Sequence, residues 1–225
     1  MCGRFAQNVI EEEVLALFDL PSTTIFPENW TKYNGAPTQK FIICRPNDRR
    51  EASLASIAWG LVPFWSKDCS MGSRLINARS ETIAEKPSFK YAFRQRRCLV
   101  PANGWFEWQR QGNSKQPYYI RSTDGLMAFA GIWETWAGEE DIHETFSLLT
   151  RQAVPALENI HHRQPVVVNP GDFDSWIMPD STGAELMAVI NSDPPCFDAW
   201  PVTTLVNNAR NNVPEVMARA TDLFD

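Results

Sequence analysis

The residue with the most distinctive chemistry is Cys2, which only Met1 precedes in the sequence. A side chain as small as that of cysteine permits removal of the initiator methionine. Removal would leave Cys2 with a free α-amine and a thiol on adjacent carbons, with ordinary pKa values of about 8 and about 8.5. Such a 1,2-aminothiol condenses with an aldehyde to an imine, and the thiol then closes a five-membered thiazolidine. Position 2 alone is equally compatible with an incidental cysteine.

Three further polar residues with chemical potential lie inside apolar segments. They are Asn77 in INAR (76–79), Glu107 in GWFEW (104–108) and His161 in IHHR (160–163). Taken singly, each is better explained as a buried polar group that is hydrogen-bonded in the core or at a cap. A buried glutamate, however, has a raised pKa and can hold a proton at neutral pH. Together, a carboxyl and an imidazole could act as a pair of proton donor and acceptor.

The composition excludes several classes of protein. The chain has 225 residues, 44% of them hydrophobic and 21% charged, with no internal repeat or long linker, which predicts one domain over residues 1–225. Five cysteines without a CxxC pair indicate reduced thiols rather than a disulfide framework. The three histidines have no zinc-site spacing, so we expect no metal. No apolar run reaches the length of a membrane span.

The charge pattern argues against a protein that coats nucleic acid through bulk positive charge, since the net charge is −6. This net charge does not exclude a local basic groove that binds nucleic acid. The basic cluster at 94–97 reads most simply as a solvated face. The pair Phe64-Trp65 precedes a polar, turn-forming run at 66–68, so it is either a stacking platform for a nucleobase or a buried corner.

The periodicity of apolar residues predicts a mixture of strands and helices. A capping pattern at Asn8 opens a helix that ends before Pro21, and a helix is expected over 80–93. Thr182 with Glu185, and Asn169 with Pro170, each open another helix. Strands are expected at 41–44, 53–62, 97–110, 117–122, 126–133 and 145–150, with a hairpin turn at 111–114 and an acidic loop at 138–141.

The opening MCGRF and the segments WGLVPFW (59–65), INARSET (76–82), CLVPANGWFEW (98–108) and IHHRQPV (160–166) together resemble the SRAP family (SOS-response-associated peptidase). The resemblance runs in order from residue 2 to the tail at 202–215. Members of this family shield abasic sites in DNA. The resemblance implies a compact α+β fold with a barrel-like mixed β core and peripheral helices. It also implies a covalent link, without a cofactor, between the N-terminal cysteine and the ring-opened aldehyde of an abasic site in single-stranded DNA.

The resemblance also implies residue roles. Cys2 is the nucleophile, Asn77 orients the cysteine backbone or the opened sugar, and Glu107 and His161 handle protons. The residues implied to contact or line the path of the DNA strand are Arg4, Asn34, Pro37, Phe64, Trp65, Arg79 and Thr150. Two positions depart from the family pattern: Gln164 stands where Met or Arg is common, and Phe64 replaces a tryptophan. Weak strand-cleaving lyase activity is expected, with peptidase activity limited to removal of residues before Cys2.

Two other functions compete with this interpretation. Glutamine amidotransferase domains also open with Met-Cys-Gly and use Cys2 to attack an amide, but the INAR, GWFEW and IHHR segments have no place in that scheme. A non-catalytic single-strand-binding module would use Trp65 and the arginines alone, leaving Cys2 and Glu107 dispensable. We expect a monomer without membrane contact, cytoplasmic and associated with the nucleoid on damaged DNA if the source is bacterial.

Overall fold

Alternation of apolar and polar residues accounts for most strands, because it places every second side chain in a core. The computed structural model describes residues 2–28, 30–138 and 141–220. Its strands are β1 (Phe5–Gln7), β2 (Lys32–Gly35), β3 (Lys40–Pro46), β4 (Ala52–Trp59), β5 (Asn77–Arg79), β6 (Arg97–Ala102), β7 (Gly104–Gln111), β8 (Ser114–Ser122), β9 (Met127–Ala137), β10 (Ile142–Gln152), β11 (Arg163–Pro165), β12 (Val167–Val168) and β13 (Phe197–Pro201). Residues 139 and 140 of the predicted acidic loop lie outside the described residues.

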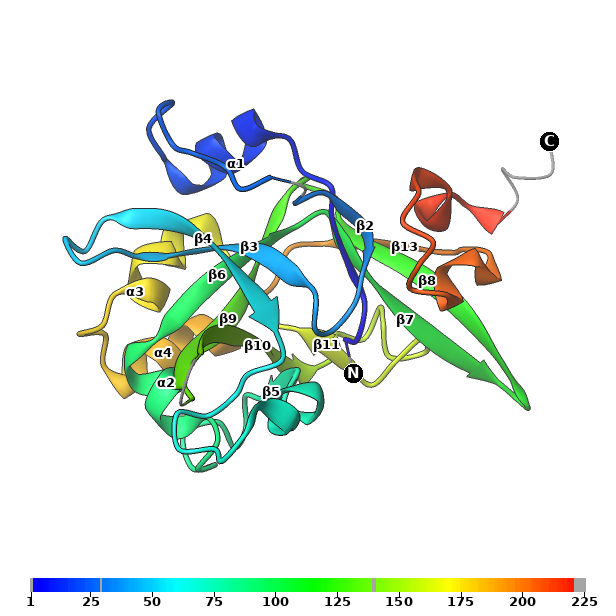
Figure 1. Ribbon diagram of the computed structural model, residues 1–225. Helices are drawn as coiled ribbons and strands as arrows, with labels where there is room; N and C mark the ends of the chain where they lie inside the picture. The colour runs from blue at the N-terminus through cyan, green and yellow to red at the C-terminus, as the bar shows by residue number, and fades with distance from the viewer. Residues whose placement is uncertain (1, 29, 139–140, 221–225) are drawn as a thin grey trace.

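Five of these strands close into a barrel. The order is β10-β4-β3-β6-β9, and β9 pairs again with β10 to complete the circle. The β4–β10 pairing is parallel, whereas the other four are antiparallel. Strand β5 runs parallel beside β10, with Asn77 opposite Leu148. The predicted α+β fold with a barrel-like mixed core is therefore confirmed (Figure 1).

A second sheet, β13-β8-β7-β1-β2, extends from the barrel towards the right of Figure 1. Its β7–β8 hairpin turns between Gln111 and Ser114, where the sequence predicted a turn. The single strand predicted over 97–110 is wrong, because the chain leaves β6 in the barrel and enters β7 in the second sheet. Asn103 makes this break: its backbone N–H donates to Ala6 O at 3.0 Å and its Oδ1 accepts from Asn8 N at 2.8 Å.

Aromatic side chains fill the barrel and anchor β1 in it. Phe5, Phe41, Trp59, Phe129 and Phe146 are all completely buried. Phe5 stacks on Phe41 with ring centroids 4.3 Å apart and meets Trp59 edge-on at 5.0 Å. Burying a phenylalanine side chain stabilises the fold by about 1.5–3 kcal/mol. Phe5 therefore fixes the position of β1 and of the residues immediately before it.

The helices are α1 (Glu11–Phe18), α2 (Lys90–Gln95), α3 (Phe173–Ile177) and α4 (Gly183–Asn191). In Figure 1, α2, α3 and α4 gather on one flank of the barrel, away from the second sheet. The predicted capping of α4 is confirmed, since Thr182 and Glu185 bond reciprocally. The region opened by Asn169 forms a short 3₁₀ turn at Pro170–Asp172 that leads directly into α3.

Two helix predictions differ from the structure. Residues 80–89 form turns, and only Lys90–Gln95 is helical. Pro87 accounts for this, because proline disfavours helical geometry in the residue before it and supplies no N–H. At the other helix, Ile10 rather than Asn8 is the N-cap, because Asn8 is bonded to Asn103.

Arg97 lies in the core beneath the helices and is not part of a solvated face. It is completely buried, and its guanidinium donates to the carbonyl oxygens of Phe93 (2.8 Å), Trp176 (2.6 Å), Arg94 (2.5 Å) and Met178. Burial lowers the pKa of Arg97 to about 10. These bonds tie α2 and α3 to the start of β6.

All five cysteines are free thiols. Within the described ranges, no helix is long and apolar enough to cross a membrane. Over the same part of the chain, no three His, Cys, Asp or Glu side chains gather as a set of metal ligands.

Candidate active site at the start of strand β1

Cys2 lies just before β1 and is completely buried in the same cluster as Phe5 and Trp59. Its Sγ is 3.9 Å from Arg4 O, to which the thiol donates a weak hydrogen bond. Burial raises the pKa of the Cys2 thiol well above its ordinary range, and the negative charge of Glu107 raises it further. The thiol is therefore protonated at neutral pH.

Asn77 fixes the backbone of Cys2. Its Nδ2 donates to Cys2 O at 2.6 Å. The side chain reaches Cys2 because β5 is held in register beside β10, where Ala78 faces the core and Asn77 faces the other way. Asn77 Oδ1 is buried and accepts no hydrogen bond from the described residues. This amide thus orients the cysteine with one end and offers an acceptor with the other.

Glu107 lies in the middle of β7 on the same face as Trp105, and the residue is only 3% exposed. Burial raises its pKa to about 7. Because this value is close to neutral pH, the carboxyl is present both with and without its proton under ordinary conditions. A group of this kind can act as an acid or a base.

His161 is carried by the loop between β10 and β11 and approaches Glu107. Its Nδ1 is 3.8 Å from Glu107 Oε1. The backbone of Arg163 holds this ring: its N–H lies 3.0 Å and its carbonyl oxygen 3.1 Å from Nδ1, which accepts from the first in one tautomer and donates to the second in the other. Burial lowers the pKa of His161, so the imidazole is neutral at pH 7. His162, which lies between His161 and Arg163 in the sequence, is exposed, and its ring stacks on that of His161 with ring centroids 4.5 Å apart.

Two glutamines hold the loop that carries His161, and neither was predicted to do so. Gln109, two residues after Glu107 on β7, donates from Nε2 to Asn159 O at 2.9 Å. Gln164 is completely buried, and its Oε1 accepts from Val154 N at 2.8 Å. The departure from the family pattern at Gln164 therefore has a structural role, since it bonds the start of the loop.

Arg163 was quoted in the IHHR segment but given no role, and it proves to connect three segments of the site. It forms a bidentate ion pair with Glu81, at 2.5 and 3.0 Å, and its Nη2 donates to Thr150 O at 2.6 Å. The hydrogen bond from Arg163 lowers the pKa of Glu81. Thr150 is completely buried. The shared motif was the only signal in the sequence that Arg163 belongs with His161.

Arg4 lies beyond Cys2 and is held by internal bonds. Its Nη1 donates to Asn34 Oδ1 and to Val206 O, both at 2.8 Å, and its guanidinium lies 5.9 Å from the centroid of Trp108. Asn34 is 1% exposed, and its Nδ2 donates to the carbonyl oxygens of the 206–211 segment. In this structure Arg4 and Asn34 position the C-terminal segment against β1 and β2. Their contact with DNA stays a prediction.

The predicted wedge and phosphate contacts lie at the surface. Phe64 is 47% and Trp65 44% exposed, so they are not a buried corner. Phe64 meets Tyr91 edge-on at 5.5 Å, which supports the loop from below. Arg79 is exposed on β5 two residues after Asn77, and Pro37 is half-buried at the β2–β3 turn. None of these placements by itself tests a contact with DNA.

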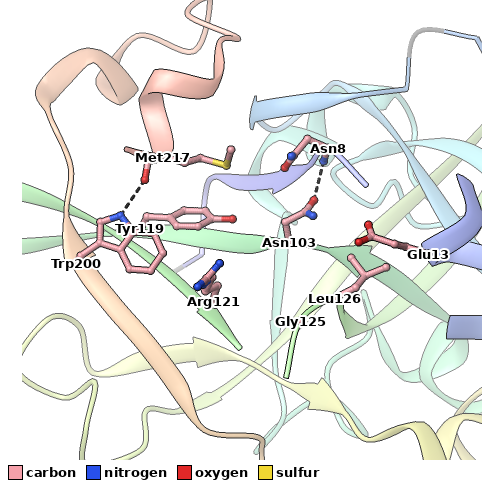
Figure 2. Close-up of a pocket in the computed structure, with 9 residues that line it drawn as sticks. All are labelled: Asn8, Glu13, Asn103, Tyr119, Arg121, Gly125, Leu126, Trp200 and Met217. Carbon is pink, nitrogen blue, oxygen red and sulfur yellow. Dashed lines mark hydrogen bonds between the residues drawn. The ribbon is translucent and has the colours of Figure 1, made fainter. Parts of the chain in front are cut away.

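A separate pocket of about 330 Å³ lies on the other face of the second sheet (Figure 2). Tyr119 and Trp200 form one side of it, and Asn103 with Glu13 forms the other. Phe106 packs with Tyr119 on this face, whereas Glu107 points to the opposite one. The pocket therefore contains none of the predicted site residues.

Comparison with known proteins identifies the family and supports the fold. Residues 1–209 match the family model described as SOS response associated peptidase (SRAP). The chain is 35% identical to the abasic site processing protein YedK of Escherichia coli strain K12, over 96% of this chain and 99% of that protein. It is 33% identical to the abasic site processing protein YoqW of Bacillus subtilis strain 168, with the same coverage. A crystal structure of a protein from Bacteroides thetaiotaomicron superposes with a TM-score of 0.85 at 27% identity, covering 97% of this chain and 100% of that one.

Proposed function

The chain belongs to the SOS response associated peptidase (SRAP) family, and on that premise we propose that it processes abasic sites in DNA by bonding to them covalently. Removal of Met1 would make Cys2 the first residue. Its amine and thiol would then form a thiazolidine with the ring-opened aldehyde of an abasic site in single-stranded DNA. The adduct would shield the site. The observation that supports this most strongly is the meeting of Asn77, Glu107 and His161 around Cys2 in one buried place.

The first step of the proposed reaction opens the sugar. An abasic deoxyribose is mostly a closed hemiacetal, and only the open form carries an aldehyde. Neutral His161 accepts the proton of the C1′ hydroxyl while the bond between C1′ and the ring oxygen breaks. Protonated Glu107 delivers a proton to that oxygen. The lowered pKa of His161 and the raised pKa of Glu107 suit these two assignments at neutral pH.

In the second step, the Cys2 amine adds to the aldehyde carbon and water leaves as the imine forms. His161 returns the proton it gained to the carbonyl oxygen, and Glu107, left as a carboxylate by the first step, moves a proton from the nitrogen to the departing hydroxyl. The resulting iminium gives its N–H proton to Glu107, which restores both side chains. The thiol then adds to the imine carbon, and its proton goes to the nitrogen. The net change joins aminothiol and aldehyde with release of one water. The amine acts first because burial keeps the thiol protonated.

Asn77 would make these steps effectively intramolecular. By holding Cys2 O at 2.6 Å, it fixes the residue that carries both nucleophiles. Such pre-positioning contributes on the order of 7 kcal/mol to lowering a barrier. The buried Oδ1 of Asn77 accepts no hydrogen bond from the described residues, and it would accept one from a hydroxyl of the opened sugar.

The same imine permits a side reaction. Until sulfur captures it, the C2′ hydrogens are acidified, and β-elimination would cleave the strand on the 3′ side of the lesion. We therefore propose weak lyase activity that competes with ring closure. The peptidase activity in the family description would be limited here to removal of residues before Cys2.

The test separates the amine from the thiol. Cys2→Ser, with Met1 removed and confirmed by intact mass, keeps the amine but replaces sulfur with oxygen. On an abasic oligonucleotide, this variant should be trapped by borohydride as a reduced imine. It should show little adduct that survives heat and denaturant without borohydride, because an oxazolidine reopens more readily than a thiazolidine. The wild type should form the lasting adduct without reductant.

Two outcomes would contradict the mechanism. If Cys2→Ser traps nothing with borohydride, the amine is not the first nucleophile. If it forms a heat-stable adduct without borohydride, the thiazolidine is not what makes the link durable. A matched control is wild type with an uncleaved N-terminal extension, which should bind the oligonucleotide and form no adduct. A glutaminase assay on the same preparations tests the amidohydrolase alternative.

A further inference from the structure

Two exposed cations face each other across the β7–β8 hairpin. Arg110 on β7 lies directly opposite Lys115 on β8, which places both side chains on one face of the sheet. Like charges in opposite positions repel each other. Within residues 2–28, 30–138 and 141–220, neither side chain forms an ion pair or a side-chain hydrogen bond. No contact within the described residues therefore offsets the repulsion between Arg110 and Lys115, whereas a bound anion would.

The pair opens onto the candidate site. Arg110 and Lys115 line a cavity of about 440 Å³ together with Trp108, Glu158 and His161. His161 is part of this lining, and its Nδ1 is 3.8 Å from Glu107 Oε1. Three residues along an extended strand span about 10 Å, so Arg110 is that far along β7 from Glu107 and, by alternation, projects from the other face of the sheet. The cavity meets the candidate site at His161, which belongs to both.

Most other cations around the site are already occupied. Arg4 donates to Asn34 and a backbone carbonyl, and Arg163 is paired with Glu81. Arg79 is exposed on β5. In Figure 1, β5 and the tip of the β7–β8 hairpin lie on opposite sides of the start of β1. With a net charge of −6, the chain cannot attract DNA through its overall field, so single phosphates must be held locally.

We infer that Arg110 and Lys115 together hold one backbone phosphate of the bound strand, on the side of the abasic nucleotide away from Arg79. The guanidinium fork and the ammonium group supply several donors to one phosphodiester, which relieves the repulsion between the two cations. Glu158 also lines the cavity, and its negative charge would repel the phosphate and weaken binding. This site rests on the proposed function for the identity of the strand. Trp108 and His161 are also part of its lining.

The test compares two double variants of equal charge. Arg110→Gln/Lys115→Gln removes the pair, and Arg49→Gln/Arg94→Gln removes two exposed arginines elsewhere, so each changes the net charge from −6 to −8. The probe is a labelled single-stranded oligonucleotide with a tetrahydrofuran abasic analogue, which binds without cross-linking. At low salt, the first variant should bind about tenfold more weakly and its salt slope should fall by about 0.7, the value for one phosphate. The control should change less than about twofold, and Glu158→Gln should bind more tightly than wild type.

Truncated probes locate the contact. When the oligonucleotide is shortened from one end, the defect of Arg110→Gln/Lys115→Gln should disappear, and shortening from the other end should leave it intact. A defect equal to that of the control, or one that persists on every truncated probe, would overturn the inference. Adduct formation by wild type on a natural abasic site is scored separately. Wild type that binds the analogue through this pair but forms no adduct would refute the proposed function and leave the phosphate site standing.

Discussion

Replacing Glu107 with Gln should stabilise the protein at alkaline pH while slowing its chemistry. Burial raises the pKa of Glu107 from 4.5 to about 7. In the unfolded chain this carboxyl ionises near its ordinary value, so between pH 4.5 and 7 the unfolded state loses a proton that the folded state keeps. The free energy of unfolding therefore falls as pH rises through this window and is level above it.

The size of the effect follows from the two pKa values. Their difference corresponds to about 3 kcal/mol, because each pKa unit is about 1.4 kcal/mol. This is a large share of a typical folding free energy of about 5–15 kcal/mol. Glu107→Gln keeps the shape and polarity of the side chain but cannot ionise. Its stability relative to wild type should therefore increase by about 3 kcal/mol between pH 4 and pH 8.

Urea unfolding of wild type and Glu107→Gln at pH 4 and pH 8 gives four unfolding free energies. The difference between variant and wild type is taken at each pH, and the change in this difference between the two pH values is compared with the expected value of about 3 kcal/mol. The contributions of titrating groups that the substitution leaves unchanged cancel in this comparison. His161, with Nδ1 only 3.8 Å from Glu107 Oε1, is the group most able to disturb it, so the comparison is repeated in a His161→Gln background. Glu185→Gln is the control, because the pH dependence of stability that it removes should have the opposite sign. Hydrogen bonds from Thr182 lower the pKa of Glu185, so its contribution is present above its ordinary pKa and is lost as pH falls.

The rate of adduct formation links this stability effect to function. If protonated Glu107 is the acid, the wild-type rate should decline as pH rises through about 7, and Glu107→Gln should be slower by roughly 10²-fold or more. A difference in unfolding free energy that is the same at pH 4 and pH 8 would refute the reasoning. Glu107 would then be ionised at neutral pH in the folded protein and could not supply the proton.

Three other predictions follow from the geometry. His161→Gln should slow adduct formation by about tenfold or more in single-turnover gels, whereas His162→Gln, which changes an exposed ring, should not; equal defects would mean that the wrong histidine is assigned. Trp65→Ala should reduce the ratio of cross-linking rates on single-stranded over duplex DNA, and an unchanged ratio would remove the wedge. Arg97→Met should lower the free energy of unfolding by about 3–5 kcal/mol, because four carbonyls lose their donor; a loss below about 1 kcal/mol in urea unfolding would contradict this.

Local signals in the sequence were sufficient for several elements. The turn at 111–114 and the capping box of Thr182 depend on residues within a few positions of one another, and both are present. The failures at 80–93 and at 97–110 have different causes. Pro87 is a local signal that was outweighed by the surrounding helix formers. The break at Asn103, by contrast, depends on bonds to Ala6 and Asn8, about a hundred positions away, which no local pattern contains.

The site shows the same division. Motifs in the sequence named Cys2, Asn77, Glu107 and His161, because each motif is contiguous and specific. They could not indicate that Asn77 bonds the carbonyl of Cys2, which requires the pairing of β5 with β10. The supporting bond from Gln109 was equally invisible, because an exposed-looking glutamine on a strand carries no distinctive signal. The sequence thus sufficed to name the candidate catalytic residues, but not most of the residues that position them.

The electrostatics of the site explain why its cations lie at the rim. Burial leaves the Cys2 thiol protonated, His161 neutral and Glu107 about half ionised at pH 7, so the centre carries little charge. Such a centre suits a condensation that expels water, because a proton donor is retained and few charged groups must be kept hydrated. A centre without positive charge cannot attract a phosphate backbone, however. In our proposal the attraction comes from Arg79 and from the Arg110–Lys115 pair, which are exposed. Chemistry and affinity are therefore assigned to different residues, and substitutions of the second group should weaken binding while leaving the rate within the bound complex unchanged.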